Sequence, residues 1–125
     1  MDQLDKFGRR SVLTCPDCNG VMWEMDEGEL MRFRCHVGHT YSAELMSVAI
    51  DENLRRALAA ALRALDERMA LAQKLHKQAV DDGAQAMAEL WSRRVGEYRR
   101  EADVIRGSIQ HMEEISAGEQ MKRAG

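Results

Sequence analysis

The residue types that bind metals are concentrated in one short stretch, TCPDCNGVMWEMDEGELMRFRCHVGHTYS, which spans residues 14–42. This stretch holds all three cysteines of the 125-residue chain and two of its four histidines. Cys15 and Cys18 form a C-P-x-C motif, and two thiolates at this spacing can bind one metal ion. Cys35 and His39 form a C-x3-H motif about 16 residues later. Two such pairs with a hairpin between them are typical of a zinc ribbon.

The predicted metal ligands are Cys15, Cys18, Cys35 and His39. His39 is preferred over His36, because C-x3-H lets the chain turn through Gly38, whereas His36 directly follows Cys35 and tends to point away. Gly20 is expected at a strained position of the first turn. Zinc is the expected metal, since three soft thiolates and one imidazole suit its tetrahedral coordination. Four protein ligands leave no open position for water, which predicts a non-catalytic site.

The residues between the two motifs predict a β-hairpin. VMWEM and LMRFRC alternate in character around the acidic segment 26–29, so residues 13–41 are expected to form the ribbon. Trp23 and Phe33 are expected to cover a miniature core. If Met25 pairs with Leu30, Trp23 lies opposite Arg32, where the two can stack; the alternative is that this face is an exposed binding surface. Residues 1–12 are expected to be a flexible lead or linker.

After Ser42 the pattern changes to a helical period. Ser42 is a suitable N-cap with Glu44 in the first turn, and a helix is expected over about 42–80. Asp81, Asp82 and Gly83 should end this helix and begin a second one over about 84–116. The apolar stripes of the two helices comprise Leu54, Leu58, Leu62, Leu65, Met69 and Ala72, and Trp91, Val95, Tyr98, Ala102, Ile105, Ile109 and Met112.

The expected fold is therefore α+β and mostly α, with a small zinc ribbon followed by a long antiparallel two-helix hairpin over 42–116. Residues 117–125 lack an apolar period and are expected to be a flexible tail. Beside its main stripe, the first helix presents Ala57, Ala60, Ala64 and Leu71, and the second adds Leu90. This surplus of apolar surface predicts a homodimer that forms a four-helix bundle, with docking onto a separate protein partner of unknown identity as the alternative.

Composition excludes several classes of function. The net charge of −3 gives no basic footprint for nucleic acid, and no apolar run approaches the roughly 20 residues of a membrane span. Because the N-terminus MDQLDKFGRR also lacks the apolar stretch of a signal peptide, a cytoplasmic location is expected. The odd number of cysteines favours thiolate–metal chemistry over disulfides in a reducing compartment. A nucleic-acid-binding ribbon remains the alternative, with phosphate contacts from Arg9, Arg10, Arg32 and Arg34. Charge argues against it, because residues 1–40 hold five Lys or Arg against seven Asp or Glu.

No enzyme site is predicted. His76 and His111 are lone histidines on the expected helices, where solvation or helix packing explains them. Once the cysteines bind metal, no serine or cysteine nucleophile has a visible partner base, and no glycine-rich phosphate loop is present.

The order of these motifs resembles a known family. C-P-x-C-x-G, a W-E strand, an acidic turn with Gly28, L-x-R-F-R-C-x-V-G-H-x-Y-S and a helix with A-L-x-A-L-x-E-R are similar to the C-terminal extension of bacterial CheB-type protein-glutamate methylesterases. The resemblance runs from about Leu13 to about Ile115. It implies an accessory role in chemotaxis signalling. The methylesterase domain lies upstream in those proteins and is absent from this sequence, so no esterase activity is implied.

Overall fold

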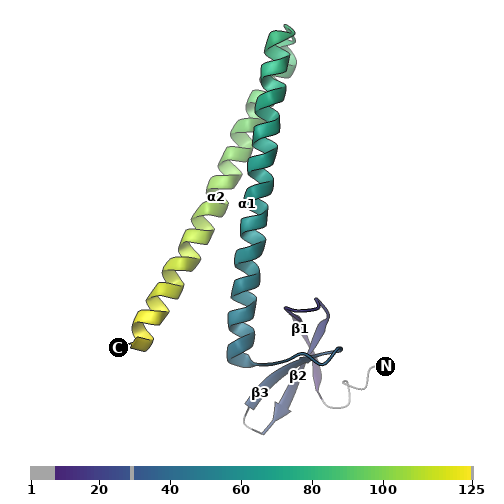
Figure 1. Ribbon diagram of the computed structural model, residues 1–125, viewed down its shortest axis with the longest axis vertical. Coiled ribbons are helices and arrows are strands. Elements are labelled where there is room, and N and C mark those ends of the chain that lie inside the picture. The colour runs from purple at the N-terminus through teal and green to yellow at the C-terminus, as the bar shows by residue number, and fades with distance from the viewer. Residues whose placement is uncertain (1–7, 29, 125) are drawn as a thin grey trace. The chain divides into compact units, whose positions relative to one another are not determined.

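The computed structural model describes residues 8–28 and 30–124 of the chain. The chain divides into two compact units, residues 1–54 and residues 55–125. All strands belong to the first unit, and the long helix α1 (Ala43–Asp81) continues from the first unit into the second, where it is followed by α2 (Gln85–Ala124) (Figure 1). The predicted fold class, α+β and mostly α, is confirmed.

The first unit contains a four-stranded antiparallel sheet in the order β1 (Arg9–Thr14), β2 (Val21–Glu27), β3 (Leu30–Cys35) and β4 (Thr40–Ser42). The sequence predicted only the central hairpin of β2 and β3. The expected flexible lead over 1–12 is wrong for residues 9–12, which belong to β1, while residues 1–7 lie outside the described part of the chain. These residues are strand because they pair with β2, which their own polar sequence does not reveal.

The β2–β3 hairpin has a tighter turn than expected. Met25 lies opposite Arg32 and Glu27 opposite Leu30, so the turn has two residues instead of four. Gly28 has a φ of 70°, the left-handed conformation that such a turn favours. The expected pairing of Met25 with Leu30 is therefore wrong by two positions. A shift of two positions still leaves every side chain on the expected face of the sheet.

Trp23 has different neighbours from those predicted. It lies opposite Arg34 on β3, not Arg32, and opposite Arg10 on β1. The guanidinium carbon of Arg10 is 5.6 Å from the ring centroid, within the range of a cation–π interaction. Trp23 is only 4% exposed, so the interpretation of this side chain as an exposed binding surface is wrong.

The core of the first unit is small and includes part of α1. Its buried members are Cys15, Met22, Phe33, Cys35 and Met46. Phe33 thus covers a miniature core as predicted, whereas Trp23 alternates with Met22 and faces the other side of the sheet. Met46 is 2% exposed and comes from the first turn of α1, so the expected end of the ribbon at residue 41 lies inside this unit.

Both ends of α1 have the predicted local signals. The Leu45 N–H donates to Ser42 Oγ at 3.2 Å, which is an N-cap. At the other end, the Gly83 N–H donates to the Val80 carbonyl at 3.1 Å and the Ala84 N–H to the Ala79 carbonyl at 2.8 Å. This bond pattern, with Gly83 at a φ of 71°, is a Schellman motif. The predicted helix break at residues 81–83 is confirmed.

The second unit is the predicted helical hairpin. Its buried cluster comprises Leu65, Ala72, Tyr98 and Ala102, against which Leu62, Met69, Trp91, Val95 and Ile105 pack. The two helices run antiparallel, because Arg55 of α1 bonds Ser116 near the end of α2 and His76 contacts Ala88 near its start (Figure 1). Leu54, which was expected in the seam, is 48% exposed and belongs to the first unit.

The second helix is longer than predicted. It continues through Gly118 to Ala124, so the expected flexible tail over 117–125 is wrong for residues 117–124. Helix propensity explains the difference, since no proline interrupts this segment and one glycine costs only about 1 kcal/mol relative to alanine. Neither helix, over its described residues, is long and apolar enough to cross a membrane.

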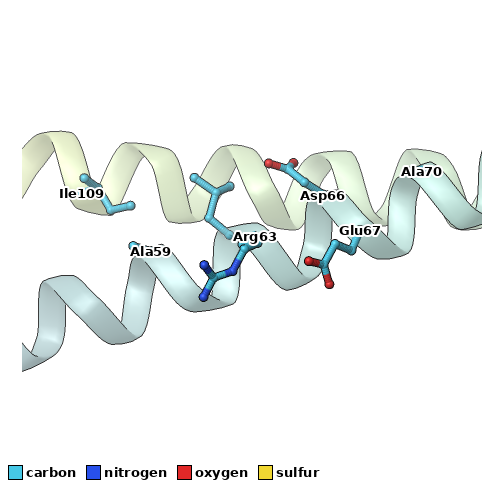
Figure 2. A pocket seen from close by; sticks show the side chains of 7 residues that line it. Ala59, Arg63, Asp66, Glu67, Ala70 and Ile109 are labelled. Atoms are coloured by element: carbon cyan, nitrogen blue, oxygen red, sulfur yellow. The ribbon is translucent and has the colours of Figure 1, made fainter.

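A shallow groove of about 420 Å³ follows one flank of the helix seam (Figure 2). It is lined by Ala59, Leu62, Arg63, Asp66, Glu67, Ala70 and Ile109. Asp66 points toward α2, where Arg106 donates to its carboxylate at 3.1 Å. Glu67 points away from α2.

Candidate metal centre

The first pair of cysteines lies on the turn between β1 and β2. The Cys15 N–H donates to the Gly20 carbonyl at 2.7 Å, and the Asn19 N–H donates to the Cys15 carbonyl at 2.9 Å. Asn19, with a φ of 63°, occupies the left-handed position that was expected for Gly20. Asparagine tolerates this conformation, which corrects the role of Gly20. A Cβ at Gly20 would lie 3.4 Å from the Cys18 sulfur, so glycine there leaves room for the thiol.

The second pair lies on the turn between β3 and β4. The Gly38 N–H donates to the Cys35 carbonyl at 3.1 Å, and the Cys35 N–H donates to the His39 carbonyl at 3.0 Å. Gly38 has a φ of 113°, which confirms that the chain turns through this glycine. The turn returns His39 to the side of Cys35.

The two turns bring all four predicted ligands together. The ligand atoms of Cys15, Cys18, Cys35 and His39 lie within 4.8 Å of one another. His39 Nδ1 is 3.2 Å from the Cys35 sulfur and 3.6 Å from the Cys15 sulfur. Around a tetrahedral zinc ion with Zn–S of about 2.3 Å and Zn–N of about 2.0 Å, a sulfur and a nitrogen ligand are separated by about 3.5 Å. The cluster is thus compatible with a metal site.

The structure distinguishes the two histidines of the second motif. His39 is half-buried and directs Nδ1 at the sulfurs, whereas His36 is exposed and does not belong to the cluster. The preference for His39 agrees with this geometry. The sequence did not show which ring nitrogen faces the thiols, because that depends on the path of the chain after Gly38.

Burial and hydrogen bonding act on the thiols in opposite directions. Burial raises the pKa of Cys35, but N–H groups of His39, Gly38 and Val37 and the Cys18 thiol outweigh it and lower the pKa to about 6. At Cys18, the Gly20 N–H favours the thiolate, whereas partial burial and the Cys15 and Cys35 thiols raise its pKa above the ordinary value. The Cys15 and Cys35 thiols thus oppose the ionisation of Cys18, and a cation bound beside the three sulfurs would favour the Cys18 thiolate.

A hydrogen bond that the sequence did not predict joins the two turns. The Tyr41 hydroxyl donates to the carboxylate of Asp17, the residue that precedes Cys18. This bond, with partial burial, raises the pKa of Tyr41 to about 12. Asp17 and Tyr41 are 24 positions apart, so no local pattern indicated the contact. It links the turn of the first ligand pair to β4, which follows the second ligand pair.

The remaining histidines lie outside the cluster. His76 belongs to the second unit, where its Nδ1 lies 2.8 Å from the Ala88 carbonyl, as expected for a histidine in helix packing. His111 is exposed on α2.

Comparisons with models of known protein families, with curated proteins and with solved structures found no match for this chain. The resemblance to the CheB-type extension therefore stays a prediction that rests on the quoted motifs.

Proposed function

We propose that this protein is a zinc-binding, non-catalytic interaction module that acts in bacterial signalling. The convergence of Cys15, Cys18, Cys35 and His39 within 4.8 Å carries the proposal. Three thiolates and one imidazole favour zinc over harder cations such as magnesium or calcium, which prefer oxygen ligands.

A structural role for the metal follows from the number of ligands. Four protein ligands complete a tetrahedron and leave no position for a substrate or a reactive water molecule. The buried core of the first unit is also small for its length, so bound zinc would supply folding free energy that apolar burial does not. The chain's residues therefore act by holding two turns together.

The resemblance to the CheB-type extension supports a regulatory role and a protein partner. Cytoplasmic location is part of the proposal, because a reducing compartment keeps the three thiols available for metal. A pull-down from native cell extract with zinc-loaded protein would identify partners. The Cys35→Ser variant is the control, since only partners that need the folded ribbon should be lost with it.

Cobalt substitution tests the site itself. Co²⁺ added to the reduced apoprotein should give the intense visible absorption of a tetrahedral thiolate-ligated ion, saturate at about one equivalent per chain, and be displaced by zinc. Weak absorption typical of six-coordinate cobalt would contradict a closed site with three sulfur ligands and one nitrogen ligand.

A nucleic-acid-binding ribbon is the second candidate, and one observation favours it. Arg10 and Arg34 lie on either side of Trp23 in adjacent strands, and Arg32 lies on the same face. Arg9, the fourth arginine proposed for this role, is instead on the opposite face, 3.6 Å from Glu24. Binding to mixed DNA and RNA that weakens steeply with salt and is lost in Arg34→Ala would support this function.

A further inference from the structure

The three thiols of the candidate metal centre differ in their access to solvent. Cys15 and Cys35 are 0% exposed, whereas Cys18 is exposed. All three are free thiols, and their sulfurs lie within 4.8 Å of one another. A dissolved oxidant therefore reaches the sulfur of Cys18 first, and two further thiols lie close enough to react with the product.

Gly20 leaves one flank of the Cys18 sulfur uncovered. A Cβ at residue 20 would lie 3.4 Å from this sulfur. The backbone of Gly20 is outside the left-handed region, so the turn itself does not require a glycine there. The missing side chain thus gives a small molecule a path to the thiol that an alanine would narrow.

Cys15 is the thiol best placed to react with an oxidised Cys18. Both lie on one turn, which is closed by backbone hydrogen bonds from the Cys15 N–H to the Gly20 carbonyl and from the Asn19 N–H to the Cys15 carbonyl. These bonds hold the two cysteines near each other independently of a metal. Cys35 lies on the other turn, and the His39 N–H donates to its sulfur at 3.3 Å, which makes that sulfur a weaker nucleophile.

We propose that Cys18 is the site at which hydrogen peroxide oxidises this protein, and that a Cys15–Cys18 disulfide then releases zinc from the ribbon. The inference deepens the proposed zinc function and rests on it.

The oxidation takes two steps. The Cys18 thiolate attacks one oxygen of hydrogen peroxide, so that an S–O bond forms, the O–O bond breaks and hydroxide leaves. The Cys15 thiolate then attacks the sulfur of the Cys18 sulfenic acid, so that an S–S bond forms, the S–O bond breaks and a second hydroxide leaves. The two thiolates lose two electrons, peroxide gains them, and two protons from water convert the hydroxides to water.

The disulfide removes two of the four metal ligands. Cys35 and His39 remain, and two ligands do not complete the tetrahedral site that zinc requires. The ribbon then loses the folding free energy of metal binding, and with it any partner that needs the folded ribbon. A thiol reductant reverses the change, because disulfides, unlike sulfinic acids, are reducible by thiols.

Peroxide added to the full, reduced, zinc-loaded chain tests the proposal. A chromophoric chelator should report release of about one zinc ion per chain, and Trp23 emission should shift to that of an exposed ring. Trypsin cleaves after Arg10 and Arg32, so one peptide of residues 11–32 holds both Cys15 and Cys18, and Cys35 lies in another. Mass spectrometry should find the first peptide lighter by two hydrogen atoms and Cys35 still free. Reductant and zinc should restore the buried Trp23 emission.

A graded variant tests the path to the sulfur without removing a ligand. Gly20→Ala should slow zinc release by peroxide at least about threefold while zinc affinity changes by less than about threefold. Gly107→Ala adds the same methyl group on α2, with no atom within 4 Å of it, and should leave the rate unchanged. Equal rates in the wild type and Gly20→Ala would overturn attack at this flank of Cys18.

The metal content before peroxide is added separates this inference from the proposed function. A reduced chain that carries no zinc would overturn the proposed function. A zinc-loaded chain that keeps its zinc and its free thiols in excess peroxide would overturn the inference alone. So would a disulfide that links the peptide of residues 11–32 to the peptide of Cys35, or conversion of Cys18 to a sulfinic acid that reductant does not reverse.

Discussion

The two units of the chain are ordered by different means. The second unit has a continuous seam in which Leu65 and Ala72 of α1, seven positions apart, face Tyr98 and Ala102 of α2, four positions apart. The first unit has a five-residue buried cluster, and two of its members are the candidate ligands Cys15 and Cys35, both 0% exposed. The helical hairpin is thus held by apolar periodicity, whereas the ribbon core is built around the thiols that would bind metal.

This difference predicts how each unit fails. A helix hairpin loses stability gradually as apolar contacts are removed, because each of many similar contacts contributes a small part of the free energy of folding. The folding of the ribbon should depend on a few metal ligands, because a unit of this size gains little free energy from burial of apolar surface alone. A substitution can therefore be made in one unit while the other unit serves as an internal control for folding.

The largest effect is expected from Cys35→Ser. Loss of one ligand should unfold the sheet while most of α1 and α2 keeps its helix content. In a Trp91→Phe background, Trp23 is the only tryptophan, and its emission should shift from that of a buried ring to that of an exposed one. Circular dichroism should change much less. A Trp23 that stays buried in this variant would show that the sheet folds without the site.

The two histidines of the second turn should differ strongly. His39→Ala removes the nitrogen that faces the sulfurs and should weaken zinc binding at least about a hundredfold, whereas the exposed His36→Ala should change it by less than about threefold. Competition with a chromophoric chelator at fixed pH measures both affinities. The reverse order would make His36 the fourth ligand.

A smaller effect is expected from Met46→Ala, which tests whether α1 is part of the ribbon core. Met46 is 2% exposed and its removal should cost the first unit about 2–5 kcal/mol. Leu45→Ala, at the neighbouring position that is 61% exposed, should change stability by less than about 0.5 kcal/mol. Denaturant unfolding followed by Trp23 emission in the Trp91→Phe background provides the measurement. Equal effects of the two substitutions would contradict the shared core.

The smallest expected effect concerns the turn of the hairpin. Gly83→Ala forces a side chain into the left-handed conformation and should destabilise the second unit by about 1–2 kcal/mol. Gly107→Ala, inside α2 with open space around the added Cβ, should instead stabilise it by about 0.5–1 kcal/mol. Thermal unfolding followed by helix content compares them, and a shift of the same sign in both would argue against the Schellman motif.

Sequence reasoning succeeded where the signal is local. The spacing of the cysteines with His39 predicted which residues converge, and the helical period predicted the seam around Leu65 and Tyr98. The cap at Ser42 and the break at Gly83 also depend on neighbouring residues alone.

Contacts between distant segments were not predictable in the same way. The hairpin register depends on a two-residue turn at Gly28, and β1 is a strand only because β2 pairs with it. The Asp17–Tyr41 bond and the burial of Met46 join segments with no shared pattern. Predicting any of these features requires the path of the chain through the whole first unit.

The most direct test of the central claim is native mass spectrometry of the reduced, as-purified protein before and after chelation, with Trp23 emission measured on the same samples. The account predicts about one zinc ion per chain, lost on chelation together with the buried environment of Trp23 and regained when zinc is restored. A reduced protein that carries no zinc and keeps Trp23 buried would contradict it.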